Sequence, residues 1–179
     1  MNKIKKFSTS FILVQQSFLV AIPTLVLIRW LCGIPLFFED VVVYGGGVFS
    51  FSDIYSGWGS AILGFLSDVV AFAPAVFGLI TLIRLFKSYE KGEVFSVQNA
   101  MLYNKLAWLF YCDALIVKPI SNAILVLAAT MFNPVGQRVL QLSYRVPSAV
   151  SVMVGIILIF ISWVMLEGEK LREEQSLVV

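Results

Sequence analysis

The chain has 179 residues, of which 59% are hydrophobic and only 13% charged, and its mean hydropathy is +0.91. A soluble domain is nearer half apolar and a quarter charged, so this composition indicates an integral membrane protein and argues against a soluble enzyme. The chain has no histidine, which removes histidine bases, histidine metal ligands and Ser-His-Asp catalysis. A net charge of +2 is too small to indicate a polyanionic partner.

Four stretches reach the length of about 20 apolar residues that a membrane-spanning helix needs. The predicted spans are residues 11–36, 60–86, 105–132 and 147–166. Between and after them lie an outer loop at 37–59, a cytoplasmic loop at 87–104 and a cytoplasmic tail at 167–179. We therefore expect a single membrane domain at 1–179 with an all-α fold, a polytopic four-transmembrane-helix bundle.

The basic residues beside the spans predict the orientation. Nine lie on the side that holds both ends of the chain: Lys3, Lys5, Lys6, Arg84, Lys87, Lys91, Lys105, Lys170 and Arg172. Only Arg138 and Arg145 lie on the other side. Because Lys and Arg gather in cytoplasmic loops, both termini are predicted to be cytoplasmic. Helical rather than barrel-forming spans point to an inner membrane rather than an outer one.

The predicted outer loop contains the glycine triplet at 45–47, followed by the aromatic run at 48–51. Three interpretations remain open: a short hairpin, a flap at the membrane interface, and a flexible connection whose Phe side chains dip into the lipid headgroups, as loops usually behave. The glycine triplet is not a phosphate-binding loop, because the Lys-Ser/Thr pair that such a loop needs is absent.

Four ionisable residues lie within the predicted spans, at a cost of roughly 2.5–3.5 kcal/mol each at a helix centre, so we expect partners for them. Arg29 and Asp68 lie at matching depths of about 10 and 12 Å below the outer ends of their spans, which predicts an ion pair. Asp113 and Lys118 are five positions apart, about 140° around an α-helix, so they should not share a face. Asp113 then needs another partner or is protonated, and Lys118 either competes for Asp68 or extends outward.

Prolines interrupt three of the spans near their middles: Pro23, Pro74 and Pro119. Each frees a backbone carbonyl and bends its helix, which either shapes an interior cavity or is simply accommodated.

Two polar segments flank the last two spans. In the inner loop Gly92 is a helix stop and Ser96 is a good N-cap for the next helix. The tail at 167–179 reads as a charged helix that turns apolar at its end, either a solvated helix end or a docking segment.

These two segments carry a resemblance. Tyr-Glu-Lys-Gly-Glu-Val-Phe-Ser-x-x-Asn at 89–99 and Glu-Gly-x-Lys-Leu-Arg-Glu-Glu-Gln at 167–175 resemble the signatures of a bacterial four-span membrane family, domain of unknown function 2975 (DUF2975). The matching positions are Gly92, Glu93, Phe95, Asn99, Gly168, Leu171, Arg172, Glu173 and Glu174. The ending Ser-Leu-Val-Val departs slightly from the family pattern, and the first half carries no family motif.

The resemblance implies a partner but no chemistry. Members of the family are often encoded beside a small helix-turn-helix regulator, which implies a membrane protein that holds or releases a cytoplasmic repressor. The motif positions would then either dock that partner or only pack the inner helix ends together, with Arg172 paired to Glu90 or Glu93.

The leading hypothesis is a non-enzymatic membrane sensor or regulatory-interaction protein that engages a cytoplasmic partner through its inner loop and tail. The alternative is a small oligomeric transporter or channel whose path is lined by Arg29, Asp68, Asp113 and Lys118. An enzyme is the weakest hypothesis, and we expect no catalytic, cofactor-binding or metal site. The expected partners are the lipid bilayer, a cytoplasmic protein and a second copy of the chain, without direct nucleic-acid binding.

Overall fold

The computed structural model describes residues 2–34, 41–44, 47–51, 55, 57–132 and 149–177. In it, four helical stretches are long and apolar enough to cross a membrane: Phe7–Cys32, Trp58–Glu90, Val97–Thr130 and Val150–Gln175. Their large apolar side chains are widely exposed, for example Leu13 and Phe160, each at 61%. Such surfaces need lipid to cover them. The prediction of an all-α membrane protein with four spans is confirmed, and the chain is a multi-pass membrane protein.

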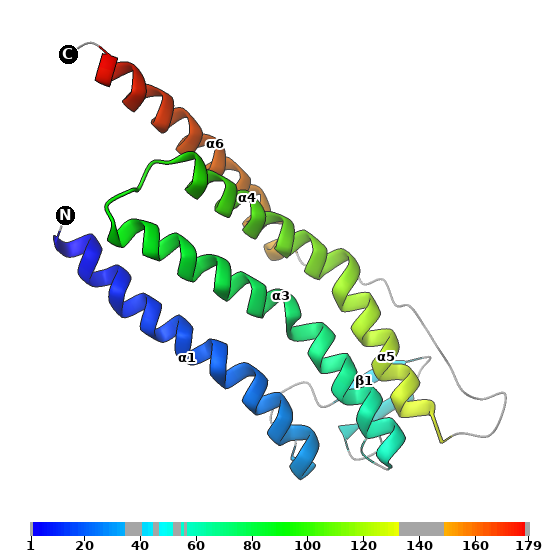
Figure 1. The fold of residues 1–179 in the computed structure, drawn as a ribbon. Coiled ribbons are helices and arrows are strands. Elements are labelled where there is room, and N and C mark those ends of the chain that lie inside the picture. The colour runs from blue at the N-terminus through cyan, green and yellow to red at the C-terminus, as the bar shows by residue number, and fades with distance from the viewer. Residues whose placement is uncertain are drawn as a thin grey trace. The chain divides into compact units, whose positions relative to one another are not determined.

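The helices are longer than the apolar spans predicted from the sequence (Figure 1). Their bounds are α1 Asn2–Cys32, α3 Trp58–Glu90, α4 Val97–Cys112, the π-helix η1 Asp113–Val117, α5 Lys118–Thr130 and α6 Ala149–Leu177. The helices extend beyond the apolar spans because the polar residues at their ends are also helical. The connection between α3 and α4 therefore comprises only residues 91–96, whereas the predicted loop was 87–104. The predicted span ends at 35–36 and 147–148, together with Arg138, Arg145 and residues 178–179, lie outside the described residues.

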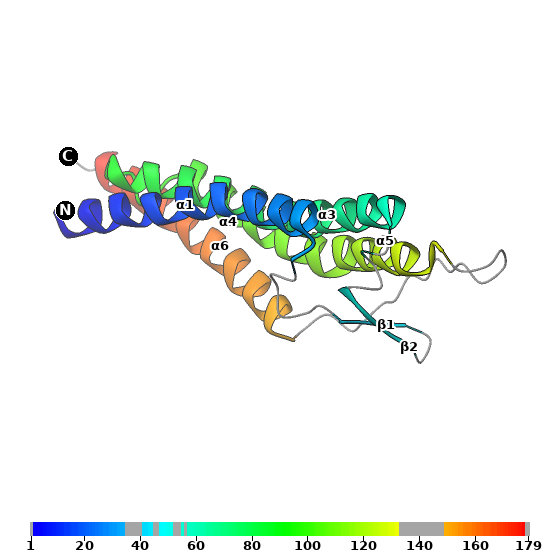
Figure 2. The ribbon, with the colours of Figure 1, turned by 90° about the horizontal axis from the view of Figure 1, so that it is seen from below.

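A short hairpin lies in the connection between α1 and α3. Strands β1 (Val41–Tyr44) and β2 (Gly47–Ser50) pair antiparallel, with Val41 opposite Ser50 and Tyr44 opposite Gly47. Figure 2 shows the two strands side by side. The hairpin interpretation of this connection is therefore confirmed for residues 41–44 and 47–50.

The chain divides into two compact units. The first unit comprises Met1–Val20, Pro74–Cys112 and Pro147–Val179, and the second comprises Ala21–Ala73 and Asp113–Val146. The chain passes from one unit to the other inside α1, at Pro74 in α3 and at the first residue of the π-helix. Each unit is described by itself below.

In the first unit α4 and α6 pack antiparallel. The Ser162 hydroxyl donates a hydrogen bond to the Ala100 carbonyl oxygen at 2.8 Å, and Gly155 lies against the ring of Tyr111. Small residues let membrane helices approach closely in this way. The start of α1 lies beside the end of α3, because the Thr9 hydroxyl donates to Glu90 Oε1 at 2.6 Å. The start of α1, the 91–96 connection and the end of α6 thus share one end of this unit.

The second unit has an apolar core formed by residues of α1, α3 and α5 and by Phe51 of the connection between α1 and α3. Its most buried members are Val26, Trp30, Phe51, Val126 and Ala128. The Ser67 hydroxyl joins α3 to α5 by donating to the Ser121 carbonyl oxygen at 2.7 Å. Gly64 lies flat against the indole of Trp30, so a side chain at position 64 has no room.

Candidate functional site

The buried side-chain amide of Asn99 hydrogen-bonds to the connection between α3 and α4. Asn99 is fully buried, and its Nδ2 donates to the carbonyl oxygens of Glu93 at 2.6 Å and Val94 at 3.0 Å. These two carbonyls belong to residues outside any helix, so they have no ladder partner of their own. Asn99 therefore supplies the hydrogen bonds that hold residues 93 and 94 in place.

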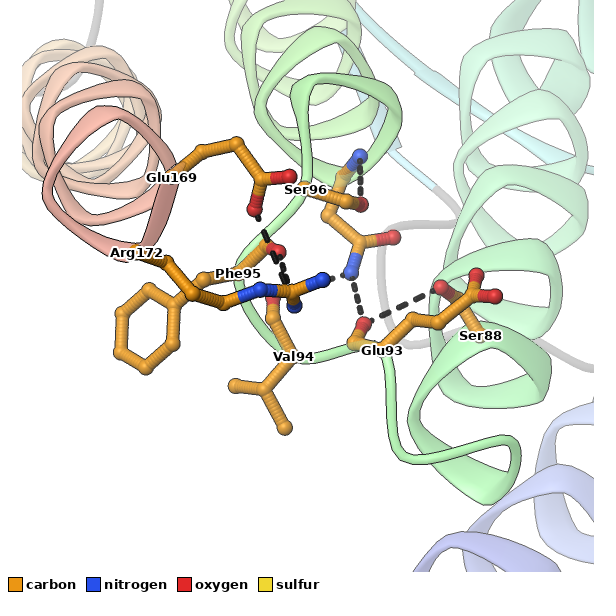
Figure 3. A network of polar contacts seen from close by, with 8 residues as sticks. Ser88, Glu93, Val94, Phe95, Ser96, Glu169 and Arg172 are labelled. Atoms are coloured by element: carbon orange, nitrogen blue, oxygen red, sulfur yellow. Dashed lines mark hydrogen bonds and ion pairs between the residues drawn. The ribbon is translucent and has the colours of Figure 1, made fainter. Parts of the chain in front are cut away.

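The two ends of the same connection are also fixed locally. Gly92 adopts φ +85°, the left-handed conformation that glycine accepts most easily after a helix, and α3 ends two residues earlier. The Ser88 hydroxyl donates to the Glu93 carbonyl at 3.2 Å, and Ser96 Oγ accepts from the Asn99 backbone N–H at 3.2 Å (Figure 3). The predicted helix stop at Gly92 and N-cap at Ser96 are both confirmed.

The end of α6 packs onto this connection. Gly168 lies under the Phe95 ring, where an added Cβ would be 2.7 Å from Cδ1. The Arg172 guanidinium donates to the Phe95 carbonyl oxygen at 3.4 Å and lies 3.9 Å from Glu169 Oε2 (Figure 3). The expectation that Arg172 pairs with Glu90 or Glu93 is wrong, because the Phe95 carbonyl and Glu169, one helical turn before Arg172, are its partners.

In the second unit a buried ion pair joins α1 to α3. Arg29 Nε lies 3.5 Å from Asp68 Oδ2, with the Arg29 side chain 7% exposed and that of Asp68 15% exposed. The ion pair predicted from matching depths is therefore confirmed. Trp30 Nε1 donates to the same carboxylate oxygen at 2.7 Å, and the Arg29 guanidinium lies 4.7 Å from the centre of the Phe51 ring. The Asp68 carboxylate and the rings of Trp30 and Phe51 thus surround the cation, and the indole N–H holds the carboxylate in place.

Sequence reasoning did not include Trp30 and Phe51 in this cluster. Trp30 could have been found, because it follows Arg29 directly and an indole N–H seeks an acceptor when buried. Phe51 could not, since it comes from the connection between α1 and α3, where no periodic sequence pattern indicates which side chain is buried.

The π-helix corrects another expectation from the sequence. Asp113 Oδ2 and Lys118 Nζ form an ion pair at 3.3 Å, although the two residues were predicted to point apart. A π-helix joins residue i to residue i+5, so residues five apart lie on one face, whereas the prediction assumed α-helical spacing. Pro119 follows directly and lacks the N–H that would bond the carbonyl four residues earlier, which favours a wider turn just before it. Lys118 is thus partnered within its own helix.

A family model described as "Protein of unknown function (DUF2975)" matches residues 52–179 of the chain. The chain belongs to this family. No curated protein and no solved structure matches the chain. The DUF2975 match confirms the resemblance seen in the sequence and contains both motif segments, together with α3, α4, η1, α5 and α6.

The geometry separates the DUF2975 motif positions into two groups. The first group is needed for packing. Gly92 makes the turn after α3, the Asn99 side chain bonds the connection from inside, and Gly168 leaves room for the Phe95 ring. The others are exposed at the surface: Glu93, Phe95, Leu171, Arg172, Glu173 and Glu174. We call these six residues the turn–tail surface. The sequence left docking and packing open for the whole set. In the structure the first group serves packing, and in the second group Phe95 and Arg172 also join α6 to the connection while their side chains stay exposed.

The described part of this DUF2975 protein contains no group of side chains suited to binding a metal ion. Among those residues no three His, Cys, Asp or Glu side chains come together in a group that could hold a metal ion. Both cysteines, Cys32 and Cys112, are exposed free thiols.

Proposed function

We propose that this protein is a non-enzymatic sensor or regulatory-interaction protein of the bacterial inner membrane, with both termini in the cytoplasm. It engages a cytoplasmic protein through the turn–tail surface. The observation that carries the proposal is the contact between the two family motifs, in which Gly168 and Arg172 of α6 meet Phe95 of the connection. Segments more than 70 positions apart therefore present a single surface.

The turn–tail surface has the composition of a docking site. Phe95 is 43% exposed and Leu171 is 53% exposed, and charged side chains surround them. Protein interfaces commonly place apolar and aromatic side chains at the centre and polar ones at the rim. Leu171 lies three positions after Gly168 on α6. Its side chain is therefore next to the part of α6 against which the Phe95 ring packs.

The charge of this segment favours a basic partner. Between residues 167 and 175 there are four carboxylates, Glu167, Glu169, Glu173 and Glu174, against two cations, Lys170 and Arg172. A helix-turn-helix regulator presents a basic face to DNA phosphates. An acidic docking helix can compete with DNA for that face, which gives the regulator two alternative bound states, one at the membrane and one on the operator.

The orientation rests on the positive-inside bias together with the first unit. The start of α1, the 91–96 connection and the end of α6 share one end of that unit, and nine of the eleven basic residues beside the spans flank this side. The motif surface then faces the cytoplasm, where a regulator is accessible.

Co-purification with the small helix-turn-helix protein from the neighbouring reading frame tests the proposal. We expect the tagged full-length chain to retain this regulator in mild detergent, and Leu171→Ser to reduce the retained amount about tenfold, as loss of a central interface side chain does. Val97→Ser is the matched control, because Val97 is 51% exposed beside the connection but outside the turn–tail surface. Equal recovery with Leu171→Ser and Val97→Ser, or no recovery with the full-length chain, would contradict the proposal.

One observation favours the alternative, a small oligomeric transporter or channel. The Asp113–Lys118 pair lies on a π-helix within the third span, and its Lys118 side chain is 63% exposed. Charges inside spans commonly mark ion paths, and π-helical turns are frequent at functional sites. A proton or ion flux into proteoliposomes that Asp113→Asn abolishes, with the protein still folded, would favour this function over the regulatory one.

A further inference from the structure

A shallow pocket of about 250 Å³ lies in the first unit, beside the connection between α3 and α4. Its lining includes three cations, two members of the connection's hydrogen-bonded network and one apolar side chain: Arg84, Lys87, Lys91, Ser88, Glu93 and Leu102. Pockets for drug-sized ligands measure roughly 300–1,000 Å³, so this one suits a smaller group.

The pocket carries an excess of positive charge. Arg84 and Lys87 are three positions apart on α3, which places their side chains on one face, and Lys91 follows directly after the end of this helix and lines the same pocket. Within the part of the chain that the structure describes, none of the three forms an ion pair. Glu93 is the one acid in the lining, so three cations face one carboxylate. An anion is the ligand that such a lining favours.

We propose that this pocket binds the phosphate headgroup of an anionic membrane lipid. The guanidinium of Arg84 offers two parallel N–H donors to phosphate oxygens, and the lysine ammonium groups add charge and further donors. Basic pockets between membrane helices bind phospholipid headgroups through this combination of groups.

The position of the pocket selects a lipid over a soluble anion. The third helical span begins at Val97 and the second ends at Glu90, so the pocket lies where two membrane-spanning helices end. Long cationic side chains at such ends extend to the headgroup level. Leu102 of α4 adds an apolar contact to the lining, which a glycerol backbone or acyl chain can use and a free phosphate cannot.

A bound headgroup also acts on the connection itself. Ser88 and Glu93 line the pocket, and they are joined by two hydrogen bonds, Ser88 Oγ to the Glu93 carbonyl and Glu93 N–H to the Ser88 carbonyl, each at 3.2 Å. Lipid occupancy therefore restrains the segment that precedes Phe95. This inference does not depend on the docking of a cytoplasmic regulator.

Lipid binding to the full-length protein in detergent tests the inference, with phosphatidylglycerol and phosphatidylcholine as probes and native mass spectrometry as the readout. We expect phosphatidylglycerol to bind more tightly, and Lys87→Gln to weaken it about fivefold, the effect of one cation near an anionic headgroup. Lys105→Gln is the matched control, because Lys105 on α4 is also exposed but does not line the pocket. We expect it to leave the affinity for phosphatidylglycerol unchanged.

Three results would overturn the inference. Equal affinity for the two lipids would show that charge does not select the ligand. An equal loss in Lys87→Gln and Lys105→Gln would assign the effect to general surface charge rather than to the pocket. A rise in the unfolding temperature with millimolar inorganic phosphate as large as that with phosphatidylglycerol would identify a soluble anion as the ligand.

Discussion

Gly64 sets how closely α3 approaches α1 in the second unit. The Trp30 indole lies directly over Gly64, and the same indole donates to Asp68, one helical turn further along α3. A glycine inside a helix normally weakens it, so its presence here is explained by the ring that takes the space of a side chain. The absence of a side chain at one residue thus allows the buried Arg29–Asp68 pair to form.

Two glycine substitutions in α3 should therefore have opposite effects. Gly64→Ala forces the buried Trp30 ring away and should lower the free energy of unfolding by about 1–3 kcal/mol. Gly78→Ala is the control, because apart from the chain neighbours and the nearby backbone of α3 itself no atom lies within 4 Å of an added Cβ at that position. It should leave stability unchanged or raise it by up to about 1 kcal/mol. Denaturation in detergent micelles, followed by circular dichroism, measures both, and equal effects would contradict this account.

Asn99 should be the most sensitive polar residue of the family motif. Asn99→Ala leaves the Val94 carbonyl without its side-chain donor and the Glu93 carbonyl with the Ser88 hydroxyl alone, which should cost about 2–3 kcal/mol of unfolding free energy. Asn104→Ala serves as the comparison, since Asn104 is exposed on the same helix and the change should stay within about 0.5 kcal/mol. Thermal unfolding of the two purified variants distinguishes them, and the account fails if their midpoints coincide.

At the level of elements, the sequence predicts what depends on local pattern. The four spans follow from apolar length, the end of α3 from Gly92, and the start of α4 from Ser96. The π-helix does not follow, because spacing arguments assume 3.6 residues per turn throughout a helix. Pro119 indicates that the helix is distorted near it, but not that the distortion is a π-helical turn. The Asp113–Lys118 ion pair was therefore not predicted.

The π-helix predicts a difference between two single-residue deletions. Removing Leu115, exposed within the π-helix, leaves Asp113 and Lys118 four positions apart in a regular α-helix, where they still share a face. The phase of α5 is preserved. Removing Ile120 instead rotates the buried face of α5 by about 100°. That face includes Ser121, Val126 and Thr130.

Fluorescence-detected size-exclusion chromatography of the two deletion variants compares them directly. The Leu115 deletion should give a monodisperse peak close to that of the unmodified protein, and the Ile120 deletion should give aggregate or little protein. Similar loss in both variants would mean that the wider turn is required for the fold and is not simply an accommodated extra residue.

For the whole molecule, the sequence predicted which segments share a side of the membrane but not how they touch. The positive-inside bias and the family motifs place the connection and the tail on one side. Their contact through the Phe95 carbonyl and ring depends on α4 packing antiparallel to α6, and apolar residues lie all around these spans. Without an amphipathic pattern, no sequence signal selects the neighbour of each helix.

Topology is therefore the property of the whole chain that a labelling experiment can decide. In a background with Cys32→Ala and Cys112→Ala, which removes both exposed thiols, single cysteines are introduced as Trp58→Cys and Glu174→Cys. Trp58 is 88% exposed at the start of α3, and Glu174 is exposed near the end of α6. A membrane-impermeant maleimide should label position 58 in intact cells and position 174 only after permeabilisation, because positively charged flanks stay in the cytoplasm. The reverse pattern would place the turn–tail surface outside the cell, where no cytoplasmic regulator could reach it.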